Sequence, residues 1–373
     1  MNLRTPRSQT KFQEACEGLT RLARQSGPGA KLPTVIELRE QLGVGVNTLS
    51  EALAELEAQK LITRRHGSGI WVSPHLERTI ALLCDPLHLE GGTSPFWAML
   101  LEQLQGRVRA AHDRLEVHLL QPWNGASPWS AGLDRSLRAH EFAGILAIGL
   151  DEKQIESLRR FAVPLVAYAG HGDIKVGNDG DGTIARATRE LAARGGTRIG
   201  LWQPCVVGRP LPRQMVLDGS LRAFSTALQE AGAPFLPELS WLGSLEAPQT
   251  RASKTQQGYE LARRVFSRPR TTWPDALFVA DDMMTAGALR AFDELNVRLG
   301  DDVVFASQSS KGSHLLTGRG PMLLLEDDPG ALVSALFATL DALMRGEDVP
   351  RAQWLPSTLH SVDAARPEVA TTR

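Results

Sequence analysis

The sequence predicts a fold in two parts. Residues 1–78 are expected to form a small α+β domain of three helices and a two-stranded wing, and residues 79–362 a two-lobed α/β domain with parallel sheets. Three observations support this prediction: amphipathic helical patterns up to residue 59, two strand-like runs after them, and a later alternation of short apolar runs with helical patterns. Residues 363–373 are expected to be a flexible tail.

The N-terminal helices are indicated by apolar spacing and by end signals. Residues 8–25 carry apolar side chains at intervals of three and four, before Ser-Gly-Pro-Gly ends the pattern. Thr34 is expected to cap a second helix, because Glu37 follows three residues later as a capping-box partner, and Gly43 ends it. A third helix is expected over residues 47–59. Its core-facing residues are Leu49, Ala52, Leu53 and Leu56.

The wing is indicated by two short apolar runs around a glycine-rich tip. The runs LITRR (61–65) and IWVSP (70–74) flank residues 66–69, His-Gly-Ser-Gly, which suit a tight hairpin. The order helix, helix, turn, helix, wing is the layout with which DNA-reading proteins place a helix in the major groove. A plain helical bundle with an incidental hairpin is the alternative, and the spacing, the turn glycine and the basic wing together disfavour it.

The remainder of the chain has the sequence pattern of an α/β fold. Strand-length apolar runs such as TIALLCD (79–85) and DALFVA (275–280) are separated by longer helical patterns. Strands buried on both faces and joined by helices form parallel sheets. The runs are too many for one sheet, so two lobes are expected. Lobe one takes about residues 79–172 and 309–350, and lobe two about residues 173–308 and 351–362.

Composition limits the function classes. The net charge is −1, but residues 1–78 hold eleven Lys/Arg against eight Asp/Glu (+3), and the remainder thirty against thirty-four (−4). The three cysteines lie far apart and match no metal-ligand spacing, which favours a reducing compartment. No secretion signal or membrane-length apolar run is visible, so a cytoplasmic protein without a membrane partner is expected.

A set of positions within residues 31–73 follows one ordered pattern. They are Leu32, Pro33, Leu38, Leu42, Gly43, Val44, Glu51, Ala52, Leu53, Leu56, Leu61, Ile62, the tip at 66–69, Trp71 and Val72. In these positions the chain resembles the GntR family of winged-helix repressors. The resemblance implies a winged helix-turn-helix domain that binds DNA.

A second pattern runs through the α/β part. Its positions are residues 94–97 (Ser-Pro-Phe-Trp), Val176, Asp179 and the segments 191–200, 274–295 and 323–336. Here the chain resembles the LacI-type sugar-sensing domain, which is shaped like a periplasmic binding protein (type I). The two halves together resemble arabinose-type repressors of the GntR group.

The chain departs from the GntR pattern where the family's arginines normally touch DNA. The usual Ser-Glu-Arg is Thr-Val-Ile at residues 34–36, Ser/Thr-Arg is Gly-Val at 45–46, and a further arginine is Ser50. No lysine or arginine lies between Val44 and Leu56. Because phosphate neutralisation supplies most non-specific affinity, the wing and the N-terminal arm are expected to supply the missing charge.

The candidate DNA-contacting residues lie at the helix starts and on the wing. Asn47 can pair with adenine, and Thr48 or Ser50 can contact a base edge, a thymine methyl group or a phosphate. Arg64 and Arg65 can enter a minor groove, or be solvated strand residues. The full candidate set is Thr34, Gly45, Asn47, Thr48, Ser50, Arg64, Arg65, His66 and Gly67.

The candidate ligand residues follow predicted strands, because ligands of α/β proteins bind at the carboxyl ends of the strands. Aromatic faces stack on sugars, and carboxylates accept hydrogen bonds from sugar hydroxyls. The set is Phe96, Trp97, Trp202, Gln203, Arg213, Asp281, Asp282, Gln308 and Lys311. Trp97 can instead be core packing, and Asp281 can be a helix cap, which would leave Asp282 as the better ligand residue.

The departures in this half concern two family positions. The usual Gly-Phe-Asp is Ser-Gln-Ser at residues 307–309. An arginine of the family maps to Ser220, unless Arg213 fills its role.

These patterns favour a ligand-responsive DNA-binding transcription regulator. We expect a dimeric repressor of carbohydrate-utilisation genes, with a double-stranded DNA operator and a sugar-like effector bound between the lobes. One alternative is a sensor with a degenerate head that acts through a protein partner. Another is an α/β enzyme, which the absence of a GxGxxG, a P-loop and a nucleophile elbow disfavours. No cofactor, catalytic residue or metal ligand is expected.

Overall fold

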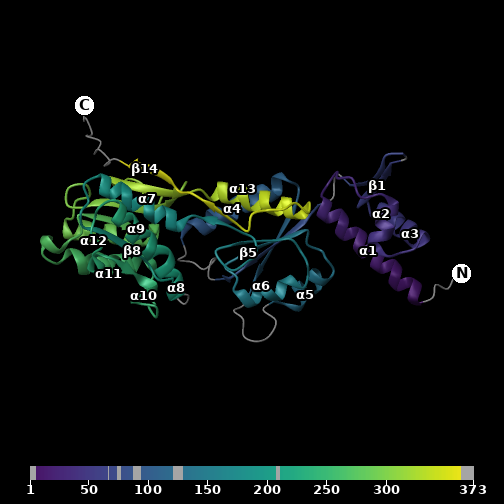
Figure 1. Cartoon of the computed structure of the whole chain (residues 1–373), viewed down its shortest axis with the longest axis horizontal. Coiled ribbons are helices and arrows are strands. Elements are labelled where there is room, and N and C mark those ends of the chain that lie inside the picture. The colour runs from purple at the N-terminus through teal and green to yellow at the C-terminus, as the bar shows by residue number, and fades with distance from the viewer. Residues whose placement is uncertain are drawn as a thin grey trace, which may run out of the picture. The chain divides into compact units, whose positions relative to one another are not determined.

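The computed structural model describes residues 6–65, 67–73, 77–86, 94–120, 129–206 and 211–362 (Figure 1). The chain divides into two compact units. Unit one comprises residues 1–90, 101–177 and 332–353, and unit two comprises residues 91–100, 178–331 and 354–373. Among the described residues, no helix combines the length and the apolar character that crossing a bilayer requires.

The N-terminal part of unit one is the predicted winged helix-turn-helix, here called the head. It contains α1 (Pro6–Ser26), α2 (Val35–Leu42), α3 (Val46–Ala58) and the antiparallel pair β1 (Ile62–Arg65) and β2 (Gly69–Val72). Gly43 ends α2 in the left-handed region at φ 62°, which glycine adopts without strain. The buried residues that hold the head together are Ala15, Leu19, Leu38, Leu49, Ala52, Leu53, Leu56, Ile62, Ile70 and Val72.

The rest of unit one is built on a six-stranded sheet of order β13-β7-β6-β5-β3-β4. Its strands are β3 (Thr79–Cys84), β4 (Arg114–Leu119), β5 (Gly144–Ile148), β6 (Leu165–Tyr168), β7 (Lys175–Asn178) and β13 (Ala352–Leu355). The pairings from β4 through β7 are parallel, as predicted. The helices of this part are α5 (Ala131–Arg138), α6 (Glu152–Arg159), residues 101–110 of α4 (Pro95–Ala110) and residues 332–344 of α13 (Pro329–Met344).

An ion-pair network fixes the segment that follows the head. Arg78 precedes β3 and donates to both carboxylate oxygens of Asp113, at 2.9 and 2.6 Å, and to Asp341 of α13 at 3.0 Å. Arg107 of α4 pairs with the second oxygen of Asp341, so α4 and α13 lie side by side (Figure 1). The start of β3 is therefore tied to two helices of unit one.

Unit two has a second six-stranded sheet, of order β14-β12-β11-β10-β8-β9. The pairings from β9 to β12 are parallel, and β14 runs antiparallel to β12. The strands are β8 (Ile199–Gln203), β9 (Trp241–Leu242), β10 (Ala276–Val279), β11 (Val304–Ser310), β12 (Met322–Asp327) and β14 (Thr358–Val362).

Helices cover both faces of this sheet and bury two hydrophobic clusters. α7 (Gly180–Ala193) and α9 (Arg222–Glu230) cover one face, and α11 (Lys254–Phe266) and α12 (Asp282–Leu295) the other. The short elements are α8 (Arg213–Val216), a π-helix (Leu217–Leu221), α10 (Gly243–Glu246) and two 3₁₀ turns (Pro237–Leu239 and Arg270–Thr272). The predicted two-sheet parallel α/β architecture is confirmed.

Candidate functional site: a helix-turn-helix face and a buried carboxylate cluster

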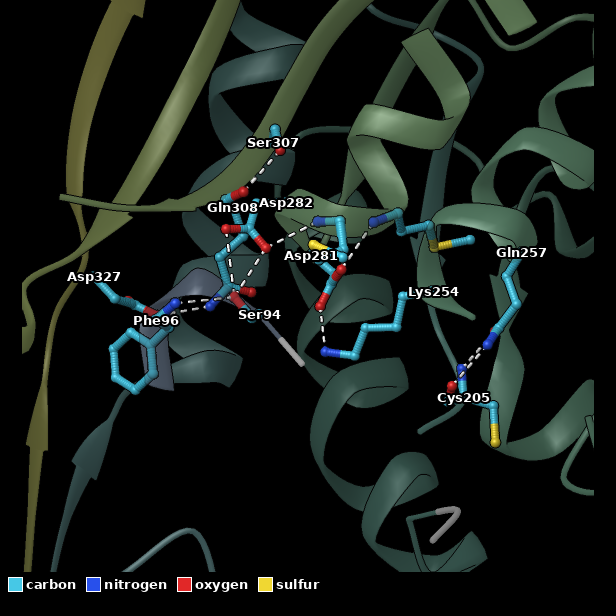
Figure 2. A network of polar contacts seen from close by, with 12 residues as sticks. Ser94, Phe96, Cys205, Lys254, Gln257, Asp281, Asp282, Ser307, Gln308 and Asp327 are labelled. Carbon is cyan, nitrogen blue, oxygen red and sulfur yellow. Dashed lines mark hydrogen bonds and ion pairs between the residues drawn. The ribbon is translucent and has the colours of Figure 1, made fainter. Parts of the chain in front are cut away.

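The carboxyl ends of three neighbouring strands bring polar side chains together in unit two. β10, β11 and β12 are parallel neighbours, so their carboxyl ends meet at one edge of the sheet. Asp282 begins the helix after β10, Gln308 lies within β11, and Asp327 is the last residue of β12. Figure 2 shows these side chains with Ser94, which precedes α4. We call Ser94, Asp282, Gln308 and Asp327 the polar cluster.

Asp282 is buried although it carries a carboxylate. Only 4% of the residue is exposed, and its side chain accepts a hydrogen bond from the Ser94 hydroxyl at 3.1 Å and from the Met283 amide at 2.9 Å. Burial, and next the charge of Asp281, raise the pKa of Asp282 to about 6. The group is therefore mostly ionised at neutral pH, but it takes up a proton at a higher pH than an ordinary aspartate does.

Asp327 repeats this arrangement on the next strand but one. It is 7% exposed and accepts a hydrogen bond from the Gln308 amide group at 2.8 Å. Burial raises the pKa of Asp327 to about 6, and the charge of Asp282 adds to the rise. Two desolvated carboxyl groups thus influence each other's protonation, and both keep acceptor capacity beyond the hydrogen bonds that they make.

Asp281, predicted as a ligand residue or a helix cap, makes the cap. Its side chain accepts a hydrogen bond from the Met284 amide at 2.9 Å and pairs with Lys254 of α11 at 2.6 Å (Figure 2). Burial acts to lower the pKa of Lys254, but the neighbouring Asp281 carboxylate outweighs it and raises that pKa. Asp281 is therefore neutralised locally, whereas Asp282 faces a hydroxyl and a backbone amide.

The remaining predicted ligand residues have different surroundings. Phe96 is buried in the first turn of α4, beside the polar cluster, and its ring meets the half-buried Trp97 edge to face at 5.6 Å. Gln203 donates to Ser220 at 3.3 Å, and Lys311 pairs with Asp328 at 2.7 Å. Arg213 is exposed on α8.

Trp202 lies in the hydrophobic core of unit two, which corrects its predicted place in the ligand site. Its indole is fully buried, donates to the backbone oxygen of Leu239 at 3.3 Å and packs edge to face against Phe266. Successive side chains of a strand point to opposite faces of the sheet, and Trp202 points to the face that α11 and α12 cover. An aromatic residue near the end of a strand can therefore pack in the core and not face the edge of the sheet where ligands bind.

Three residues of the site were not in the predicted set: Ser94, Lys254 and Asp327. Asp327 ends a strand-length apolar run, so the rule that selected Asp282 applies to it equally. Ser94 precedes Phe96 in the segment 94–97. Nothing in the sequence marks Lys254, because its role depends on the packing of α11 beside α12.

The predicted DNA-contacting residues of α3 lie where the helix begins. Gly45 is the N-cap residue and offers no side-chain cap, so the first amides of α3 receive no side-chain hydrogen bond there. Asn47 and Ser50 are exposed, and Thr48 is half-buried. Thr34 is exposed at the start of α2, but its hydroxyl and amide bond the Glu37 carboxylate at 2.8 and 2.7 Å as a capping box.

The wing cations are held by neighbouring groups. Arg64 donates from its amide and guanidinium to Glu57 at 2.9 and 2.8 Å, and the hydrogen bond from the amide, then that from the side chain, lowers the pKa of Glu57. Arg65 and Lys31 each lie over the Trp71 ring, at 5.2 and 5.7 Å from its centre. Gly67 has φ 70°, as a hairpin tip requires, and His66 lies outside the described residues.

Two family models match the chain. Residues 22–72 match the model of bacterial regulatory proteins of the gntR family, and residues 188–362 match the periplasmic binding protein-like domain. Both matches confirm the resemblance that the sequence predicted.

Curated relatives match separate stretches of the chain. The HTH-type transcriptional regulator GalR of Streptococcus thermophilus is 28% identical over 175 residues, which cover 45% of this chain and 49% of GalR. The HTH-type transcriptional regulator Rv1152 of Mycobacterium tuberculosis is 44% identical over 46 residues, covering 12% of this chain and 38% of Rv1152. The chain thus spans about half or less of the length of these relatives.

Solved structures share the fold at low sequence identity. The transcription regulator CcpA of Lactococcus lactis superposes with a TM-score of 0.59 at 19% identity over 78% of this chain and 100% of its own. The regulator CelR in complex with cellobiose has a TM-score of 0.57 at 20% identity, covering 90% of this chain and 100% of CelR. The lac repressor dimer bound to operator has a TM-score of 0.58 at 17% identity, covering 78% of this chain and 95% of its own. The chain therefore contains a segment that matches the gntR-family model and a segment that matches the periplasmic binding protein-like domain, and it shares the fold of these solved regulators.

Proposed function

We propose that the protein is a transcription regulator that binds operator DNA through the head and senses a sugar-like effector at the polar cluster. The observation that carries this proposal is the pair of buried carboxyl groups, Asp282 and Asp327, at the carboxyl edge of a sheet in a chain whose first domain is of the gntR family. The proposal includes regulation of carbohydrate genes by repression.

The chemistry of the polar cluster suits a polyhydroxylated ligand. The carboxylates of Asp282 and Asp327 are desolvated acceptors, and a sugar hydroxyl donates to such a group without adding charge. Phe96 supplies an apolar face next to them. CelR, which shares this fold, was solved with cellobiose, which supports the assignment to a carbohydrate.

A homodimer is part of the proposal. The lac repressor, whose sensor has the same fold, was solved as a dimer on its operator, and two heads bind two half-sites more tightly than one head binds one. A cytoplasmic location is part of the same proposal, because a chromosomal operator has to be accessible to the protein. The coupling free energy required between effector and DNA is ordinary, ~1–3 kcal/mol.

The route of coupling in unit one starts at Arg78. This residue follows the head and is held by Asp113 and by Asp341 of α13. A shift of α13 on effector binding would therefore act directly on the segment that carries the head. Arg78→Ala is expected to leave effector affinity unchanged while weakening the effect of effector on DNA binding.

The test uses a panel of neutral mono- and disaccharides that includes galactose and cellobiose. Each sugar is screened by the thermal stability of the full chain, and each hit is titrated by calorimetry against the natural chain and Asp282→Ala. We expect one class of sugar to bind, and Asp282→Ala to weaken it at least tenfold, or about 1.4 kcal/mol, with DNA binding unchanged. Equal binding by both chains would place the site elsewhere.

A sensor that acts through a protein partner is the second candidate. The observation that favours it is the exposed face of α3, which carries no lysine or arginine and exposes Glu51 and Glu55, so that it offers little phosphate anchorage. The two candidates separate in a DNA-binding assay with the full chain. The enzyme alternative gains no such support, because the relatives are named as transcriptional regulators.

A further inference from the structure

The head exposes large apolar side chains at the starts of its second and third helices. Val35 is 47% exposed, Ile36 65% and Val46 56%. Val35 and Ile36 open α2, and Val46 is the first residue of α3. Three large apolar side chains exposed within residues 35–46 make this stretch a candidate contact surface.

The exposed side chains of α3 continue this surface. Val46, Ser50 and Ala54 are spaced by four residues and all exposed, so they form one stripe along the helix, with Asn47 beside it. None of the four carries a charge, but the exposed Glu51 and Glu55 follow Asn47 at intervals of four along the same helix. In a helix-turn-helix the N-terminal residues of the second helix contact base edges in the major groove, which is the position of Val46 and Asn47.

The major groove presents a single apolar group, the C5-methyl of thymine. Methyl-bearing side chains such as those of valine, isoleucine and alanine gain by burying that methyl group, and they gain nothing from the polar edges of guanine or cytosine. Asn47 complements such a site, since an asparagine side chain pairs with the N6 and N7 positions of adenine.

We propose that the head selects its operator by contact with thymine methyl groups, with Val46 as the main contact and Ile36 and Ala54 in support. The inference rests on the proposed DNA-binding function and adds a specificity to it. We expect a half-site rich in A·T pairs, whose bases are contacted without an arginine. Arg64 is tied to Glu57 and so is not positioned for guanine in the structure.

Charge favours DNA over a protein as the occupant of this surface. Residues 1–78 carry a net charge of about +3 from eleven Lys/Arg against eight Asp/Glu. The start of α3, with no side-chain cap at Gly45, adds the partial positive charge of unbonded amides, which attracts a phosphate. The start of α3 therefore combines an exposed apolar side chain with partial positive charge, whereas Glu51 and Glu55 lie further along the helix.

The experiment uses the full chain and the DNA fragment that it enriches most from genomic DNA. Each thymine of the fragment is replaced in turn by deoxyuridine, which removes the methyl group and keeps every hydrogen-bonding group of the base. At the contacted thymines we expect affinity to fall about fourfold for each methyl group, the value of one buried methylene. The natural chain is compared with Val46→Ala, Ile36→Ala and, as a matched control, Val117→Ala.

Val117 is also an exposed valine, at 42%, but it lies on β4 and outside the head. Val117→Ala should leave the response to deoxyuridine unchanged, whereas Val46→Ala should lower affinity for the thymine site and abolish the response at one thymine of each half-site. Ile36→Ala is the second variant. It should abolish or weaken the response to deoxyuridine at a different thymine.

Three other outcomes of this experiment would overturn the inference. Specific binding that is insensitive to deoxyuridine at every position removes methyl reading and leaves the DNA-binding function intact. Sensitivity that persists unchanged in both head variants assigns the methyl contacts to other residues. Failure to enrich any fragment removes the inference together with the DNA-binding function and favours a protein partner.

Discussion

The contact face of α3 and the polar cluster of unit two differ in how they hold their functional groups. Val46, Asn47 and Ser50 are exposed and uncharged, and no side-chain cap precedes them. Asp282 and Asp327 are buried and hydrogen-bonded, with pKa values raised to about 6. Substitution on the first surface changes what is bound at little cost in stability. Substitution in the second changes binding and folding together, because the desolvation of its carboxylates is already part of the folding free energy.

The largest effect expected is in the core beneath α3. Leu49→Ala should destabilise the head by ~2–5 kcal/mol, since Leu49 is fully buried, and should abolish DNA binding. Its exposed neighbour offers the matched control: Ser50→Ala should leave stability within ~0.5 kcal/mol. Hydrogen exchange of head peptides in the full chain measures both. Unchanged protection in Leu49→Ala would show that the α3 core does not hold the head together.

Substitution in the polar cluster should instead raise the free energy of unfolding at neutral pH. A carboxyl group whose pKa is raised on folding contributes stability that is present below its unfolded pKa and lost as pH rises through the folded value. For Asp327 this window runs from 3.8 to about 6. Asp327→Asn should therefore raise the free energy of unfolding by ~2–3 kcal/mol above pH ~7 and change it little near pH ~4.

Asp328 is the control for this measurement, because its neighbour Lys311 and backbone amides of α13 lower its pKa. Its contribution is present above the unfolded pKa and lost as pH falls, so Asp328→Asn should reduce stability slightly at neutral pH. Urea unfolding of both variants across this range gives the comparison. A pH dependence in Asp327→Asn equal to that of the natural chain would contradict the account of the polar cluster.

Substitution of Thr34 distinguishes a structural role of its hydroxyl from a direct contact with DNA. Thr34→Ala removes the capping box with Glu37 and should cost ~1 kcal/mol of head stability, while Thr34→Ser should retain the cap. The readout is head protection together with DNA affinity. Loss of affinity in Thr34→Ala at unchanged stability would show that the hydroxyl contacts DNA directly.

The smallest effect is expected on the wing. If Arg65 contacts a phosphate, Arg65→Ala should weaken binding to all sequences alike and reduce the slope of log affinity against log salt by ~1. Glu57→Gln, which loosens the hold on Arg64, should steepen that slope. Salt titrations on a fixed fragment measure both changes. Slopes that stay the same in both variants would remove the wing from the DNA contacts.

The sequence predicted the buried face of α3 because one periodicity, three and four, identifies both the helix and its core side. Leu49, Ala52, Leu53 and Leu56 are all buried, as predicted. The ends of apolar runs likewise placed Asp282 beside a strand end. The same signal failed for Trp202, because a run that is apolar on both faces does not show which way its last side chain points.

What the sequence did not indicate depends on packing between distant segments. Ser94 and Asp282 are 188 positions apart and meet in one hydrogen bond, and Lys254 meets Asp281 only because α11 packs on α12. The exposure of Ile36 and Val46 was also hidden, since apolar residues at helix starts are as often buried as exposed. A periodic pattern describes a single element and not the neighbour that covers it.

DNA reading by the head is tested by selecting genomic fragments with the purified full chain at low salt and then titrating the most enriched fragment with salt. We expect one palindromic site whose log affinity falls with log salt at a slope of about −0.9 for each phosphate neutralised, with several phosphates involved. Binding that is equally weak to every fragment, with no site enriched, would contradict it and leave the head as a scaffold.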